Sequence, residues 1–228
     1  MAACPAAAAA AAALSAMAAW AEPAARAARA TLSSLNIFRR LCGAPHIRRH
    51  FSQTLTGLRD MSWPHEHIIP ELIDFYGDPV LHSSIDPKWE RQNIVDLIPP
   101  YAMRYSWGPP VKALRFHKKC REAFGEALLA IKKLYGTQKD IEAHRLHLTG
   151  GSLMVRLKRG SSHIWSIHSW GAALDIDPQH NPFPARWRPG FIPLEAAGAF
   201  QQCGLIWRGA NGDNDPMHFQ AAEHNYRM

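Results

Sequence analysis

Cysteine is scarce in this sequence, and its four copies are scattered. Cys4, Cys42, Cys120 and Cys203 form no pair at a two-residue spacing, which excludes a thiolate zinc site and indicates no disulfide framework. Long apolar runs are also missing, so no segment is predicted to span a membrane. Because the chain has 13 histidines, any metal site would use imidazole and carboxylate groups.

An excess of one charge is missing from most of the chain, although the formal net charge is +7. Residues 1–60 contain seven arginines, no lysine and two acids, whereas residues 61–228 have a net charge of only +2. A nearly neutral body does not indicate a face that binds a polyanion, so we expect no nucleic-acid partner. Internal repeats and wall-binding repeats are missing as well, and we expect a monomer.

Alanine dominates the start of the chain, with 19 copies in the first thirty residues. Residues 1–60 could be a secretory signal with the small-x-small site "AWA", but the usual positive start is missing and alanine makes a weak apolar core. They could also be an arginine-rich transit peptide, or untranslated sequence before a true start at Met61. We favour the last interpretation because globular patterning begins there, and we expect the extension to be disordered, cleaved or mis-assigned.

Residues 61–228 combine one long helix with clustered strands. Apolar side chains recur at three- and four-residue steps from Val111 to Leu134, which predicts a helix over 111–135 with a solvated His117. Shorter helices are expected between 62 and 77 and over 193–204. Strands are expected at 145–151, 153–157, 172–177, 205–207 and 217–220. The pattern predicts an α+β fold with a small antiparallel sheet and flanking helices.

The stretch "SIHSWGAALDID", residues 166–177, places a histidine seven residues before an aspartate that ends an apolar run. On a strand, Asp175 lies on the face opposite Leu174 and Ile176. A buried carboxylate needs a partner, and Gly171 allows the chain to turn so that His168 and Asp175 converge. This pair alone predicts either a zinc site or a capped turn beside a surface histidine.

The later stretch "DNDPMHFQ" adds a second histidine to this argument. His218 and Gln220 lie on one strand face, while Met217 and Phe219 lie on the other. Together with His168 and Asp175, His218 would complete three protein ligands and leave a fourth position for water, as in catalytic zinc sites. Asp215 lies three residues before His218, where it could take a proton from that water.

These two motifs carry a resemblance to a known family. "SIHSWGAALDID" resembles the Ser-x-His-x-x-Gly-x-Ala-x-Asp signature of the zinc D-Ala-D-Ala carboxypeptidases, whose family includes the phage L-alanyl-D-glutamate endolysins, and "DPMHF" resembles its acid-x-x-His ending. The openings "WPHEHIIPELIDFYGDP" and "GGSLMVRLKRGSS" are similar to the phage-type members. The likeness covers about residues 61–222 and implies a fold like these peptidases and the Hedgehog signalling domains.

The resemblance also implies roles for individual residues. The family's zinc ligands fall on His168, Asp175 and His218, and its catalytic acid/base falls on Asp215, where the cell-wall dipeptidases carry Glu. An arginine near the scissile carbonyl would be Arg156 or Arg159, of which we favour Arg156. Ser166 is expected to fix the turn or to bond to a zinc ligand.

The expected function is therefore hydrolysis of peptidoglycan stem peptides by a zinc peptidase domain, residues 61–228. Asp at position 215 favours an L-alanyl-D-glutamate endopeptidase over a D-Ala-D-Ala carboxypeptidase. Such an enzyme would act on the cell wall, in the periplasm or outside the cell, although no convincing signal peptide is present. The alternative from another class is a non-catalytic zinc-bearing recognition module, which the presence of Asp215 disfavours.

Overall fold

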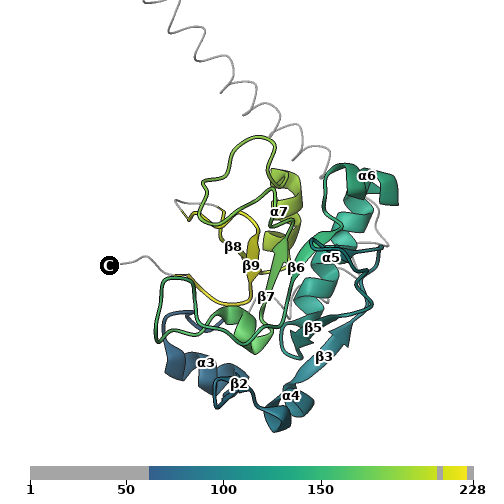
Figure 1. Cartoon of the computed structure of the whole chain (residues 1–228). Coiled ribbons are helices and arrows are strands. Elements are labelled where there is room, and N and C mark those ends of the chain that lie inside the picture. Colours follow the sequence, from purple (N-terminus) through teal and green to yellow (C-terminus); the bar gives the residue numbers. More distant parts are fainter. Residues whose placement is uncertain (1–61, 210–212, 225–228) are drawn as a thin grey trace, which may run out of the picture. The chain divides into compact units, whose positions relative to one another are not determined.

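A computed structural model describes residues 62–209 and 213–224 of the chain. The alanine- and arginine-rich extension, residues 1–60, lies outside the described residues, so the expectations about it remain predictions. The described part begins with helix α3 (Ile69–Tyr76), the short strands β1 (Val80–Leu81) and β2 (Ser84–Ile85), and helix α4 (Pro87–Asn93) (Figure 1).

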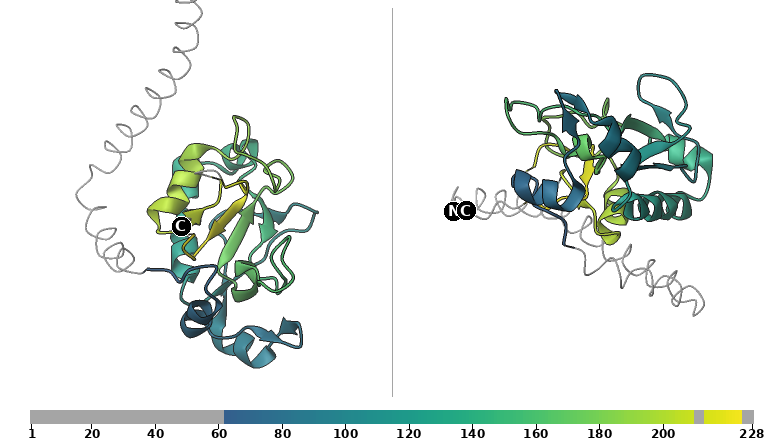
Figure 2. Two further views of the ribbon diagram at one scale, coloured as in Figure 1. Left: turned by 90° about the vertical axis from the view of Figure 1, so that its left-hand side faces the viewer. Right: turned by 90° about the horizontal axis from the view of Figure 1, so that it is seen from below.

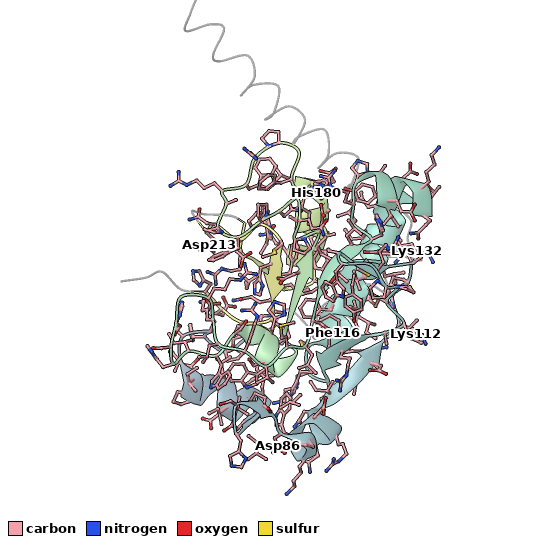
Figure 3. The ribbon with its side chains drawn as sticks, in the orientation of Figure 1. Asp86, Lys112, Phe116, Lys132, His180 and Asp213 are labelled. Atoms are coloured by element: carbon pink, nitrogen blue, oxygen red, sulfur yellow. The ribbon has the colours of Figure 1, made fainter. Side chains whose placement is uncertain are left out.

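A second pair of strands follows this opening. β3 (Ile94–Leu97) pairs antiparallel with β5 (Leu114–His117), and helices α5 (Arg121–Tyr135) and α6 (Gln138–Ala143) come next. Phe116, labelled in Figure 3, stacks on Phe124 of α5 with the ring centroids 4.3 Å apart. This stacking joins the β3–β5 pair to the long helix.

The prediction of a helix from residue 111 was wrong for its first ten residues. Leu114 and Phe116 are both buried and alternate with exposed Arg115, which is a strand pattern, and pairing with β3 satisfies the backbone of this segment. His117 is therefore buried and not solvated, with its Nε2 atom 3.1 Å from the carbonyl oxygen of Tyr76. The helix ends before Gly136, as predicted.

The main sheet has five strands in the order β4-β6-β7-β9-β8. Its strands are β4 (Arg104–Tyr105), β6 (Leu148–Gly151), β7 (Ala173–Ile176), β8 (Ile206–Trp207) and β9 (His218–Gln220). All neighbours are antiparallel except β4 and β6, which run parallel and correct the expectation of a purely antiparallel sheet. Residues 153–157 do not form the expected strand, and among them only Leu157 makes a bridge, which is an isolated one to Trp165.

The two faces of the main sheet are different. Helix α7 (Leu194–Gln202) lies beside α5 on one side of the sheet, and loops lie on the other side (Figure 2). Phe219 of β9 stacks on Phe200 of α7, with the ring centroids 4.1 Å apart. Since side chains alternate along a strand, His218 and Gln220 lie on the face away from α7. The mixture of helices and small sheets agrees with the α+β class.

Among residues 62–209 and 213–224, no helix combines the length and the apolar character needed to cross a bilayer.

Candidate metal centre

A tight turn places His168 in the candidate centre. His168 lies in a one-turn 3-10 helix (Ile167–Trp170) that ends at Gly171, which has a left-handed conformation with φ of 62°. A side chain at Gly171 would place its Cβ atom 3.1 Å from the amide nitrogen of His117, so it would be crowded as well as strained in this backbone conformation. The chain then enters β7 at once, as the spacing of the motif predicted.

Asp175 and His218 are directly opposite each other on the antiparallel strands β7 and β9. The Oδ1 atom of Asp175 lies 2.8 Å from Nδ1 of His218 and 3.2 Å from Nε2 of His168. The two imidazole nitrogens are also 3.2 Å apart. All three side chains are buried, and the structure therefore brings together the three residues that the sequence singled out.

Hydrogen bonds orient both rings toward this point. Nδ1 of His168 lies 2.8 Å from the carbonyl oxygen of Ser152, which can only accept, so in the neutral ring Nδ1 carries the proton and Nε2 has the lone pair. Nε2 of His218 lies 3.0 Å from Oε1 of Gln220, which leaves Nδ1 facing Asp175. Two nitrogen lone pairs and one carboxylate oxygen thus converge, and this set of donors fits a zinc ion.

The charges in the cluster are strongly coupled. Burial raises the pKa of Asp175, but hydrogen bonds and charge from His168 and His218 outweigh it and hold that pKa far below its usual range. Burial lowers the pKa of His218, but the hydrogen bond and charge of Asp175 outweigh it and raise that pKa. The carboxylate therefore favours a positive charge at this point, from a proton or from a metal ion.

Asp215 lies at the edge of the same site. Its Oδ1 atom is buried and has no hydrogen-bond partner among the described residues. Burial raises the pKa of Asp215, and the charge of Asp175 raises it further. Asp215 is not part of the three-residue group that could hold a metal ion.

The cluster opens into a pocket of about 270 Å³, close to the lower end of the range for small-ligand sites. Side chains of both charges line it. The acidic ones are Glu66, Asp175, Asp213 and Asp215, and the basic ones are Arg156, Lys158, Arg159 and Arg208.

The two candidate arginines both line this pocket, but they have different neighbours. Burial lowers the pKa of Arg156, while the charges of Asp175 and Asp215 raise it. Arg159 has its guanidinium 5.5 Å from the ring centroid of Phe183. Because Arg156 interacts with the charges of the candidate centre, it is the better placed of the two.

Ser166 is buried at the start of the 3-10 turn. Its backbone nitrogen donates to the carbonyl of Arg156 at 3.0 Å, and its carbonyl accepts from Ser169 at 2.8 Å. Ser166 was one candidate to bond to the second nitrogen of a proposed metal-binding histidine. In the structure, the carbonyl of Ser152 has this place at His168, and the side chain of Gln220 has it at His218. The sequence signal for Gln220 was its position two residues after His218 on the same strand face, whereas a backbone carbonyl such as that of Ser152 leaves no signal.

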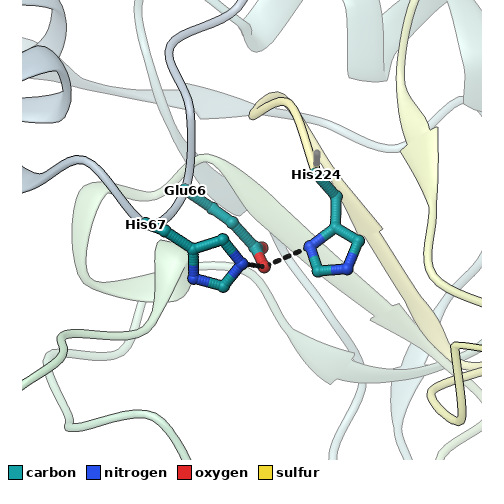
Figure 4. Close-up of side chains that lie close together, drawn as sticks. All are labelled: Glu66, His67 and His224. Atoms are coloured by element: carbon teal, nitrogen blue, oxygen red, sulfur yellow. Dashed lines mark hydrogen bonds and ion pairs between the residues drawn. The ribbon is translucent and has the colours of Figure 1, made fainter. Parts of the chain in front are cut away.

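A second cluster of two histidines and a carboxylate was missed by sequence reasoning. Glu66, His67 and His224 offer ligand atoms that lie within 4.8 Å of one another (Figure 4). Oε1 of Glu66 lies 2.5 Å from His224 and 3.1 Å from His67. These residues lie at opposite ends of the described chain, so no local spacing could have linked them.

Over part of its length, the chain is similar to a known protein family. A family model described as D-alanyl-D-alanine carboxypeptidase matches residues 159–221. This range contains His168, Asp175, Asp215 and His218, and it supports a metallopeptidase of this family without indicating the endolysin branch. Neither a search of curated proteins nor a search of solved structures finds a match to the chain.

Proposed function

We propose that the chain is a zinc-dependent peptidase that hydrolyses peptidoglycan stem peptides. The observation that carries the proposal is the convergence of His168 Nε2, His218 Nδ1 and Asp175 Oδ1. The buried Oδ1 atom of Asp215, which has no hydrogen-bond partner in the described part of the chain, lines the same pocket. The match to the carboxypeptidase family over the same residues supports the peptidase class and a peptidoglycan-derived substrate.

The proposed ligands are His168, Asp175 and His218. Two imidazoles and a carboxylate form a typical catalytic zinc set, in which three protein ligands leave a position for water or substrate. When bound, zinc polarises a carbonyl and lowers the pKa of a coordinated water to about 7. The protein's contribution is to hold the three donor atoms within one small, buried volume.

Asp215 is proposed as the acid/base. Its buried carboxylate lines the pocket and is not engaged by a hydrogen bond at Oδ1 among the described residues. It would take a proton from the attacking water and return it to the amine that leaves when the peptide bond breaks. The raised pKa of Asp215 suits it to hold that proton between the two steps.

Arg156 is proposed to stabilise the negative charge that develops on the scissile carbonyl oxygen. Its guanidinium lines the pocket and interacts with the charges of Asp175 and Asp215. A fixed guanidinium can instead hold a substrate carboxylate, and Arg159 is the alternative for either role.

For the bond cleaved, we propose an L-alanyl-D-glutamate endopeptidase, because Asp215 resembles the phage branch at the acid/base position. A D-Ala-D-Ala carboxypeptidase is the second candidate, favoured by the description of the matching family. A non-catalytic zinc module is disfavoured because Asp215 would then leave a buried carboxyl oxygen without a use.

The test is digestion of purified sacculi by the zinc-loaded full chain, with mass spectrometry of the products. An endopeptidase leaves L-alanine on muramic acid and releases peptides that begin with D-glutamate. A carboxypeptidase releases D-alanine and leaves the wall intact, which would replace the bond assignment. No product beyond that of the His168→Ala control would overturn the peptidase itself.

A further inference from the structure

The amide of Gln220 has only one possible orientation in its surroundings. Its nitrogen lies 2.7 Å from Oε2 of Glu66 and 2.9 Å from the carbonyl oxygen of Ala222. A carboxylate and a carbonyl can only accept hydrogen bonds, so both N–H groups of the amide point to them. The oxygen of Gln220 must then face Nε2 of His218, 3.0 Å away.

This orientation determines which nitrogen of His218 carries a proton. Because Oε1 of Gln220 can only accept, Nε2 of His218 must donate, and the lone pair of the neutral ring lies on Nδ1. Nδ1 is the atom that lies 2.8 Å from Asp175 and 3.2 Å from His168. If the amide were reversed, its N–H group would face Nε2, and the lone pair would move away from the proposed metal position.

Glu66 is itself firmly held. Its Oε1 atom accepts from Arg208 at 2.5 Å and from Lys158 at 2.9 Å, and its side chain is buried. Arg208 also forms an ion pair with Asp213 at 2.9 Å, and its carbonyl accepts from the amide of Asp215 at 3.2 Å. Glu66 therefore connects the opening of the domain to the loop that carries Asp215 and to the strand that carries His218.

The cluster of Glu66, His67 and His224 has a composition that could also suit a metal ion. One observation argues against that use. Two cationic side chains, Arg208 and Lys158, donate to the same carboxylate oxygen that would bind the metal. A cation placed there would have to displace them or be repelled by them. The carboxylate is already neutralised by the protein.

We propose that Glu66 is a positioning residue for the metal centre, acting through Gln220 to fix the orientation and tautomer of His218. This inference rests on the proposed function, because it assumes that His218 binds zinc. It also gives a role to the "WPHEHIIPELIDFYGDP" opening, which supplies Glu66. Loss of such a partner behind a metal-binding histidine typically weakens metal affinity by about 10–100-fold.

The experiment measures zinc affinity of the full chain by competition with a chromophoric chelator. Gln220→Met removes the acceptor for His218, and Glu66→Gln removes the carboxylate that orients it. Both variants should bind zinc about 10–100-fold more weakly than wild type. The visible absorption of the cobalt-substituted protein should also change in both, because the ligand geometry changes.

A matched control is Glu71→Gln, the same substitution at an exposed glutamate of the same segment, where the partner is His65 at 2.8 Å. It should leave zinc affinity and the cobalt spectrum unchanged. The cobalt spectrum separates positioning from a purely structural role, because a variant that is only less stable keeps the ligand geometry of the wild type.

The outcomes separate this inference from the proposed function. A wild-type chain that binds no zinc would overturn both. A wild-type chain that loses zinc on His168→Ala, with folded Glu66→Gln and Gln220→Met variants that bind like the control, would overturn the inference alone. A second zinc ion, lost on His67→Ala, would also overturn it. If Glu66→Gln fails to fold by circular dichroism, Gln220→Met decides.

Discussion

Glu66, His67 and His224 have the same composition as His168, Asp175 and His218, and the ligand atoms of each group lie within 4.8 Å of one another. The groups differ in what surrounds the carboxylate. Within residues 62–209 and 213–224, the close partners of Asp175 Oδ1 are the two histidines, whereas Oε1 of Glu66 also accepts from Arg208 and Lys158. Two histidines and a carboxylate that lie close together are therefore not sufficient for a metal site. The charge around them, and whether their lone pairs already accept hydrogen bonds, matter as much for metal binding.

The largest expected difference between the two clusters appears when a single histidine is removed from one or from the other. His168→Ala or His218→Ala should abolish both zinc binding and peptidase activity, because only two protein ligands remain. His67→Ala should leave one zinc per chain. Metal analysis of the dialysed variants measures the zinc content in each case. Near-full occupancy in the His168 and His218 variants would show that zinc is bound elsewhere.

The next effect concerns the acid/base beside the first cluster. Asp215→Asn should retain zinc but reduce the rate by about 10²-fold or more, the usual scale for a general base. Asp213→Asn is the matched control, because the carboxylate of Asp213, although it also lines the pocket, is already paired with Arg208. The rate should fall much less in this variant. Steady-state rates and zinc content give the answer, and loss of zinc in Asp215→Asn would make Asp215 a ligand.

The second cluster should affect stability more than chemistry, in a pH-dependent way. Burial raises the pKa of Glu66, but the charges and hydrogen bonds of Arg208 and Lys158 outweigh it and hold that pKa well below its usual 4.5. A lowered pKa stabilises the fold above pH 4.5, and this contribution is lost as the pH falls below that value.

Glu66→Gln should therefore destabilise the protein at pH 7, by about 3 kcal/mol for a broken buried ion pair. The difference in melting temperature from wild type should shrink as the pH is lowered below 4.5. A difference that is constant from pH 7 to pH 3 would show that the charge of Glu66 is not what stabilises the fold.

The smallest effect is expected from deleting residues 1–60. Both clusters use residues from Glu66 onward, and the segment has too few large apolar groups to offset an ordering entropy of about 1–2 kcal/mol per residue. Melting temperature, zinc content and activity should all be unchanged. A large loss of stability would show that the segment packs on the domain.

Sequence reasoning worked best where the signal was local. The seven-residue spacing of His168 and Asp175, with Gly171 between them, predicted their convergence, and strand alternation predicted the direction of His218. Their role as zinc ligands stays a prediction. The alternation of β9 also placed Gln220 beside His218, although its partner Glu66 lies 154 residues away and left no signal.

The errors came from patterns that fit two structures. Val111 and Leu114 suit the period of a helix, but Leu114 and Phe116 also suit a strand, and pairing with β3 decided between them. The parallel pairing of β4 with β6 depends on the path of the connection through α5 and α6, which periodicity does not report.

The pairing of Asp175 with His218 across β7 and β9 has a thermodynamic consequence. Two of the three proposed ligands are aligned by backbone register, and a slip of β9 by one residue would turn His218 to the opposite face from Asp175. The loss of side-chain freedom at these positions therefore occurs during folding of the sheet, before any ion arrives. An ion that binds to such a preorganised set of donors orders few side chains, so the entropic cost of binding is small and the affinity is higher.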